Sequence, residues 1–176
     1  MAGIIKVNQY QDFNGNTILT SDGSGNLTTM KTNYPAFQAT YSSDYIGSFS
    51  DNTDTKLTLN TKQFDTDSAY DPSTNYRFTV PVAGKYYFYG QLYNYSSNNT
   101  NIQSKIKLFK NGSEISENQV RKGSSGINNI ADALNLTFID TAAVNDYYEL
   151  YANINVSSGT DNRVYKPIFG AYRIGS

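Results

Sequence analysis

The sequence predicts an all-β protein, and three observations lead to this prediction. No segment keeps apolar residues at helical spacing over a dozen positions, so helical signals are almost absent. Apolar residues instead alternate with polar ones, as they do in strands with one buried face. Clusters of Gly, Asn, Asp and Ser interrupt these segments at short intervals, which is typical of a β-sandwich or a barrel.

Residues 1–34 differ from the rest of the chain and are predicted to form a β-rich N-terminal arm. They are polar, and they carry turn signals at Asn14-Gly15 and in the segment 22–26. The short strands expected between these turns cover residues 4–13, 16–20 and 27–32. So few apolar residues cannot make a core. The arm therefore packs on another molecule, intertwines with copies of itself, or is a loose tail.

Residues 35–176 contain clearer strand patterns and are expected to form a globular head. The longest predicted strand, Lys85 to Tyr95, is apolar or aromatic on both faces. One face carries Tyr86, Phe88, Gly90 and Leu92, and the other carries Tyr87, Tyr89, Gln91, Tyr93 and Tyr95. The other strands are expected at 35–39, 57–59, 76–80, 106–108, 115–120, 134–138, 148–156 and 168–174. This number of strands is enough for two packed sheets.

The composition excludes most catalytic chemistry. The chain has no His and no Cys, so a Ser–His triad, a Cys nucleophile, a disulfide and a zinc site of the usual N/S kind are all excluded. A formal net charge of −1 argues against nucleic acid as a partner. No stretch approaches about 18 consecutive apolar residues, so membrane insertion is not expected. The sequence therefore predicts a protein that is not an enzyme.

Loop carboxylates are the one feature that could bind a metal. They occur in pairs, at Asp51 and Asp54 and at Asp65 and Asp67. Their oxygen atoms suit calcium, although neither segment has the EF-hand pattern. Paired carboxylates also act as acid and base in glycosidases, but Asp more often stabilises a tight turn through its own backbone. We expect no cofactor, with calcium as the only candidate metal.

The segment 70–88 has the most specific pattern in the chain. A Tyr-Asp-Pro turn opens it, Phe78 lies six residues before Gly84, and Tyr86 and Phe88 follow at alternate positions. This pattern resembles the central signature of the globular-head domain of the complement first component and its relatives in the tumour-necrosis-factor superfamily. The resemblance implies a jelly-roll β-sandwich of about ten antiparallel strands that assembles as a homotrimer.

Other segments agree with this resemblance in the order that the family has them. Residues 37–39 are similar to its opening strand, residues 106–112 to a strand that ends in an Asn-Gly turn, and residues 169–172 to its closing strand. One position departs from the family, which usually has an aromatic residue where this chain has Gly90. The core at Gly90 is therefore expected to be smaller or to be filled from elsewhere.

The second face of the strand 85–95 is the predicted trimer interface. A sandwich strand needs only one buried face, and Tyr87, Tyr89, Tyr93 and Tyr95 would form an unusually large exposed patch. Tyr buries the area of its ring while its hydroxyl still finds a partner, which suits a protein interface. In the alternative interpretation, a loop of the same chain covers these rings.

The arm resembles the β-rich linkers that precede the globular tips of bacteriophage fibre and appendage proteins. The residues that carry this resemblance are 16–28, rich in Thr, Ser, Asp, Gly and Asn. It implies a virion structural protein, a tail fibre or capsid decoration, located on the virion surface. The arm would then bind other virion proteins, and its candidate anchoring residues are Ile4, Ile5, Val7, Tyr10 and Phe13.

The sequence leaves open whether the head contacts a receptor on the host surface. Polar loops predicted at the end of the sandwich could bind a glycan or a protein, or could simply be solvated. The candidate ligand residues are Ser96, Asn98, Asn101, Thr160 and Asp161. The head would be a receptor-binding tip or a decoration that stabilises the particle. The alternative function is that of a free, lectin-like ligand-binding module of the same superfamily.

Overall fold

The computed structural model describes residues 7–30, 34–96, 100–122, 127–128, 131–157 and 161–175. The chain divides into two compact units, Met1–Asn33 and Tyr34–Ser176. The described residues form β-strands and turns, and no helix occurs among them. No described helix could therefore cross a lipid bilayer. The expected all-β class is confirmed, and the two units are described separately below.

The N-terminal unit is a three-stranded antiparallel meander. Its strands are β1 (Gln9–Gln11), β2 (Thr17–Ser21) and β3 (Leu27–Met30), in the spatial order β1-β2-β3. In register, Tyr10 stands opposite Leu19, and Gln9 stands opposite Thr20. The pairing slips between Tyr10 and Gln11, because residue 18 is an extra residue of β2 at that point. The short strands predicted for the arm are therefore present.

The meander uses the same turn twice. The Asp12 carboxylate accepts hydrogen bonds from the backbone N–H groups of Asn14 (2.9 Å) and Asn16 (2.8 Å), and from the Asn16 side chain (2.8 Å). Asp22 accepts the equivalent bonds in the segment 22–26. The bond from the Asn26 side chain is the main cause of a lowered pKa for Asp22. These Asp side chains fix the turns, because they replace backbone partners that a loop lacks.

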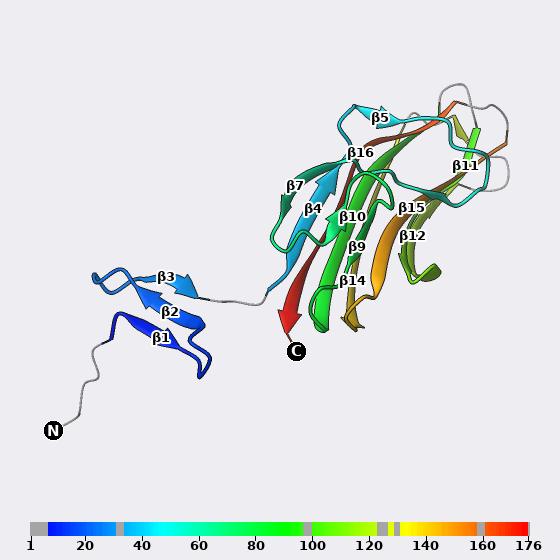
Figure 1. Ribbon diagram of the computed structural model, residues 1–176. Helices are drawn as coiled ribbons and strands as arrows, with labels where there is room; N and C mark the ends of the chain where they lie inside the picture. The colour runs from blue at the N-terminus through cyan, green and yellow to red at the C-terminus, as the bar shows by residue number, and fades with distance from the viewer. Residues whose placement is uncertain are drawn as a thin grey trace. The chain divides into compact units, whose positions relative to one another are not determined.

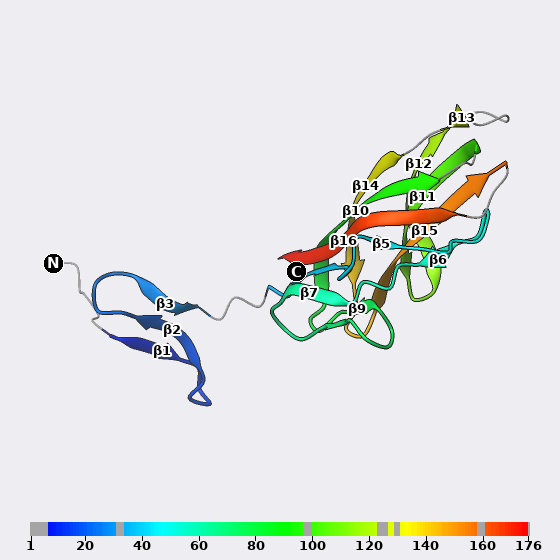
Figure 2. The same ribbon diagram turned by 90° about the horizontal axis from the view of Figure 1, so that it is seen from above.

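The head is a sandwich of two antiparallel sheets, which Figures 1 and 2 show as two layers. The first, called here the β10 sheet, has the order β14-β10-β16-β4-β7, with β5 paired to β16. Its strands are β4 (Ala36–Thr40), β5 (Tyr45–Ile46), β7 (Thr61–Asp65), β10 (Gly84–Ser96), β14 (Asp132–Ala142) and β16 (Asn162–Gly175).

The second sheet, called here the β15 sheet, has the order β12-β11-β15-β9-β8, with β13 paired to β11 and β6 paired to β15. Its strands are β6 (Thr55–Lys56), β8 (Tyr70–Asp71), β9 (Arg77–Thr79), β11 (Thr100–Lys110), β12 (Ser113–Arg121), β13 (Ile127–Asn128) and β15 (Tyr147–Val156). The chain crosses between the two sheets several times: β9 and β11 belong to the β15 sheet whereas β10 belongs to the β10 sheet, and β14, β15 and β16 alternate between the layers. This arrangement is that of a jelly roll, as the sequence predicts.

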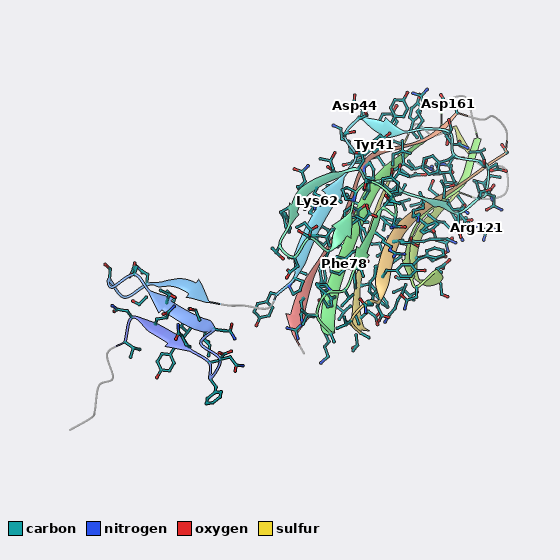
Figure 3. The ribbon with its side chains drawn as sticks, in the orientation of Figure 1. Tyr41, Asp44, Lys62, Phe78, Arg121 and Asp161 are labelled. Carbon is teal, nitrogen blue, oxygen red and sulfur yellow. The ribbon has the colours of Figure 1, made fainter. Side chains whose placement is uncertain are left out.

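Aromatic side chains from both sheets form the centre of the core. The Phe37 ring stacks on Phe78 with centroids 4.6 Å apart, and the Phe88 ring stacks on Tyr148 at 4.1 Å. Phe78 lies within the head between the layers (Figure 3). Buried tyrosine hydroxyls have partners; Tyr86, for example, donates to the Val82 carbonyl at 2.6 Å. Every second residue of β10 contributes to this core, as the alternation predicts.

The space above Gly90 is filled from the opposite sheet. A Cβ atom on Gly90 would lie 2.9 Å from the Leu150 Cδ1 atom and 3.2 Å from the Ile106 Cδ1 atom. Leu150 and Ile106 are themselves fully buried. The missing aromatic residue at this position is therefore compensated by two aliphatic side chains of the β15 sheet, the second of the two outcomes that we expected.

Candidate self-association surface

Strand β10 is an interior strand of its sheet and lies between the edge strand β14 and β16. Its inward residues are buried, whereas Tyr87, Tyr89 and Tyr95 are half-buried and Tyr93 is exposed. The four predicted interface tyrosines therefore share the outer face of the β10 sheet. No described loop of the same chain covers Tyr93, which is 42% exposed.

Neighbouring strands extend this patch with residues that the sequence analysis missed. Ile139 on β14 and Tyr172 on β16 stand opposite Tyr87 on either side. Ile139 is 56% exposed and Tyr172 is 45% exposed. The Tyr87 and Tyr172 rings lie 5.2 Å apart. The alternation of the segment 134–138 already puts residue 139 on the outer face, but only the register brings it beside Tyr87.

Tyr89 is held flat against the sheet by a close approach to the backbone. A Cβ atom on Gly170 would overlap the Tyr89 ring, so only glycine leaves room for it. The Tyr89 hydroxyl donates a hydrogen bond to Gln38 Oε1 on β4, at 2.9 Å. Burial raises the pKa of Tyr89, and the neighbouring Tyr172 adds to the effect. The centre of the face is therefore a smooth, neutral surface.

The outer face carries no formal charge over the middle part of β14, β10 and β16, and Lys166 lies at one end of this neutral area. The middle part comprises the outward residues of β10 from Tyr87 to Tyr93 and the residues that pair with them on β14 and β16. None of these residues is Asp, Glu, Lys or Arg. On β14 these positions are all exposed: Ile139, Thr137, Asn135 and Ala133. A neutral aromatic surface loses little solvation when another protein covers it.

One end of this face contains a hollow of about 570 Å³. Its lining residues are Tyr93, Tyr95, Ala131, Tyr165 and Lys166. A β-bulge shapes it, because Gln91 pairs with Ile168 but Tyr93 pairs with Tyr165, so β16 has one extra residue. Lys166 within the bulge has a left-handed φ of 44°, and bulges re-aim side chains in this way. The Tyr95 and Tyr165 rings lie edge to face at 5.7 Å.

The outer face of the β15 sheet has the opposite character. The Lys107 ammonium lies 2.8 Å from both Asp54 and Glu114, and Lys56 lies 2.8 Å from Glu149. Burial alone would lower the pKa of Lys107, but its hydrogen bonds to Asp54 and Glu114 outweigh burial and raise that pKa. This face therefore satisfies its own charges.

Two of the predicted ligand residues are not in loops. Ser96 ends β10, Asn101 lies in β11, and both are almost fully buried. The Ser96 hydroxyl donates to Asn162 Oδ1 at 3.1 Å, and Asn101 donates to Asp132 at 3.1 Å. These bonds allow polar side chains to lie inside the sandwich. The prediction that Ser96 and Asn101 lie in a loop is therefore wrong, and their contact with a ligand stays a prediction.

Of the remaining predicted ligand residues, the structure describes only Asp161. Asp161 lies at the end of the head away from the C-terminus (Figures 1 and 3). Its carboxylate accepts two hydrogen bonds from the Arg163 guanidinium, at 2.6 and 2.9 Å. Asn98 and Thr160 lie outside the described residues. Nothing tests Asp161 as a ligand contact, and it stays a prediction.

A buried polar cluster between the sheets was not predicted. Asp132 accepts hydrogen bonds from Ser104 (2.9 Å) and Asn101 (3.1 Å), and Lys122 lies 2.6 Å from it. Asn94 donates to the same Ser104 hydroxyl. In sequence these residues look like loop residues because each is polar. Their hydrogen bonds to one another offset much of the cost of burial, although the Oδ1 atoms of Asn94 and Asn101 have no hydrogen-bond partner among the residues that the structure describes. No signal in the sequence pairs these residues.

The carboxylates proposed for calcium already have donors within the protein. Asp51 accepts the Val156 N–H at 2.7 Å, Asp65 accepts the Ala69 and Tyr70 N–H groups, and Asp54 bonds to Lys107. Within the described segments, no three acidic side chains gather closely enough to hold a metal ion. Calcium binding stays a prediction, which thermal unfolding with and without a chelator would test.

The candidate anchoring residues of the arm are exposed wherever the structure describes them. Val7 and Tyr10 are each about half exposed, and Phe13 is fully exposed at the turn between β1 and β2. Ile4 and Ile5 lie outside the described residues. Exposure of these side chains is a condition for anchoring and does not by itself identify a partner.

No family model matches the sequence, and no curated protein matches it. The fold is nevertheless similar to several solved structures. The globular domain of zebrafish complement 1qA protein has a TM-score of 0.56 and 16% identity, over 80% of this chain and 97% of that one. Eiger TNF from S. frugiperda has a TM-score of 0.58 and 10% identity, over 81% and 92% of the two chains.

Murine APRIL gives a TM-score of 0.55 and 8% identity, over 80% of this chain and 99% of that one. These identities are low, so the similarity concerns the fold. It agrees with the resemblance that the segment 70–88 carries. The head of this chain therefore has the jelly-roll fold of the complement C1q and tumour-necrosis-factor globular domains.

Proposed function

We propose that the chain is a non-enzymatic structural protein of a bacteriophage particle, in which the head assembles as a homotrimer and the N-terminal unit attaches it to the particle. The observation that carries the self-association is the neutral outer face of the β10 sheet. Tyr93, Tyr172 and Ile139 are all more than 40% exposed there. A soluble monomer rarely leaves so large an aromatic patch in water.

Three copies can cover this face if each copy packs the edge of its sandwich on the next copy. Such head-to-tail contacts close into a ring, and the resemblance to the trimeric family supports the number three. The location on a virion is supported by the resemblance of residues 16–28 to phage linkers and by the exposed apolar residues of the N-terminal unit.

The hollow on the β10 sheet favours a second function, that of a lectin-like module. Three tyrosine side chains and Lys166 line it, and aromatic rings pack well against the faces of sugar rings. As part of a virion, such a head would be a receptor-binding tip. Detection of the chain by mass spectrometry in particle-free fractions, and its absence from purified particles, would favour the free module.

Light scattering on two proteins tests the homotrimer. The head has its own core, so the full chain and residues 34–176 can be compared directly. We expect a mass of three chains for both. A monomeric head beside a trimeric full chain would make the N-terminal unit the trimerising element and would overturn the role of the tyrosine face. Monomers in both would overturn the homotrimer itself.

A further inference from the structure

The N-terminal unit is folded as a sheet but has no core of its own. Leu19 is half-buried, and the other apolar side chains that the structure describes lie at the surface: Tyr10 is 51% exposed, Leu27 is 58% exposed, and Val7 and Ile18 are close to half exposed. Three short strands of this kind are at best marginally stable in water. The meander therefore requires a surface on which these side chains can be buried.

The register gives the meander two different faces. Tyr10 and Leu19 stand directly opposite each other and so share one face. Gln9, Gln11 and Thr17 belong to the other, where Gln9 donates to the Thr17 hydroxyl and Gln11 donates to Gln9. The polar face satisfies its own groups, whereas the face of Tyr10 and Leu19 is the one that gains from being covered.

Charge does not oppose the approach of a second copy. Asp12 and Asp22 are the only ionisable acids or bases except Tyr10 in residues 7–30. Both carboxylates lie in the turns at the ends of the strands and bond to the turns themselves. Three such units can therefore come together along their strands without bringing like charges into contact.

The connection to the head favours a second copy over other occupants. The unit ends at residue 33, and β4 of the β10 sheet begins at Ala36. In a homotrimer, the three units would thus be tied to one assembly by short connections. Tethering of this kind gives effective concentrations of about a millimolar, so a weak association between the units is sufficient.

We propose that the N-terminal units of three chains associate through the face of Tyr10 and Leu19 and form a shared core, while Phe13 stays outside and contacts the particle. This inference rests on the proposed homotrimer. Phe13 differs from Tyr10 because it lies in the turn beyond the strand, where the Asp12 bonds fix the backbone and its ring is fully exposed.

Hydrogen–deuterium exchange of the full-length chain, read by mass spectrometry, tests the shared core. The first variant combines Tyr10→Ser with Leu19→Ser, and its matched control combines Gln9→Ser with Gln11→Ser on the polar face. We expect the amides of residues 17–21 to exchange at least about tenfold faster in the first variant than in the wild type. The control should exchange like the wild type.

Three outcomes have distinct meanings. Equal exchange in the wild type and the first variant, with a trimeric mass for both, would overturn the shared core and leave the homotrimer intact. A monomeric wild type would instead overturn the homotrimer. If Phe13→Ser accelerates exchange as much as the first variant does, Phe13 belongs to the core and its outward role is wrong. The amides of β10 report in each experiment whether the head is folded.

Discussion

The two outer faces of the head are built by the same alternation of side chains but present opposite chemistry. On the β15 sheet, Lys107 is only 8% exposed and is bonded to two acids. On the β10 sheet, Tyr93 and Ile139 are exposed, and the outward positions paired across β14, β10 and β16 from the Tyr87 level to the Tyr93 level contain no charged side chain. Covering a face of paired charges has a desolvation cost, so such a face is best left in water. Covering a neutral aromatic face lowers the free energy, because it removes apolar surface from water. The chemistry of a sheet face, more than its strand pattern, therefore indicates whether the face is suited to a protein interface.

The largest effect is expected from a charge placed on the neutral face. Tyr87→Lys puts an ammonium between Ile139 and Tyr172, and its desolvation would cost several kcal/mol in an interface. We expect the mass in solution to fall from three chains to one at micromolar concentration. Gln119→Lys adds the same charge on β12 of the other sheet, where Gln119 is exposed, and should leave the mass unchanged. If both variants remain trimeric, the difference between the faces has no role in assembly.

A smaller effect is expected when the surface of the β10 sheet is reshaped without adding charge. Gly170→Ala would push the Tyr89 ring away from the sheet and break its bond to Gln38. Overpacking of this kind costs about 1–3 kcal/mol, which denaturant unfolding of the head would measure. Gly175→Ala is the matched control, because a Cβ atom there meets nothing within 4 Å. Equal stabilities for the two variants would show that Tyr89 moves aside without cost.

Substitutions on the outer face of the β15 sheet should change the free energy of unfolding of the head and leave the number of chains in the assembly unchanged. Lys107→Met leaves Asp54 and Glu114 without their shared cation. Because both acids remain partly in water, we expect a loss of about 1–2 kcal/mol in the free energy of unfolding. Lys105→Met removes only the longer contact to Glu117, at 3.3 Å, and should cost less than about 1 kcal/mol. A change of mass in either variant would contradict the contrast between the faces.

The smallest expected effect is a pH dependence of the free energy of unfolding, which arises from Asp54 at the outer face of the β15 sheet. Burial opposes ionisation of Asp54, but hydrogen bonds from Lys107 and Asn153 outweigh it and lower the pKa of Asp54. Its pKa is thus lower in the folded than in the unfolded state, where it is about 3.9. The resulting stability is present above that value and is lost as the pH falls through the lowered pKa. Unfolding measured between about pH 5 and pH 2 should show a shallower loss in Asp54→Asn than in the wild type. If the free energy of unfolding falls with pH equally steeply in both proteins, Asp54 does not contribute to the pH dependence.

Much of the candidate surface could be predicted because β10 has a strict alternation. Tyr87, Tyr89, Tyr93 and Tyr95 fall on one face whatever the sheet around them, since the side chains of a strand point alternately to either side. Ile139 and Tyr172 could not be assigned in the same way, because they are distant in sequence and only the register places them beside Tyr87.

Polar residues were the main source of error. Ser96 and Asn101 were predicted to lie in a ligand loop, because polar side chains without apolar neighbours usually indicate solvent. In the folded head they lie between the sheets, where Ser96 donates a hydrogen bond to Asn162 and the Asn101 amide donates one to Asp132. A pattern of single residues does not contain such pairings, because they join strands that are separated by tens of residues.

The sequence by itself determined the all-β class, most of the long strands, the two-sided character of β10 and the three short strands of the N-terminal unit. These features depend on local periodicity and turn chemistry, which neighbouring residues supply. The strand expected at 57–59 was wrong, because the nearest strand, β6, covers only Thr55–Lys56. The tertiary structure alone decided that Leu150 and Ile106 fill the space at Gly90, that Gly170 accommodates Tyr89, and that Ile139 and Tyr172 stand beside Tyr87. Each of these outcomes depends on which strands lie side by side, and packing between distant segments settles that order.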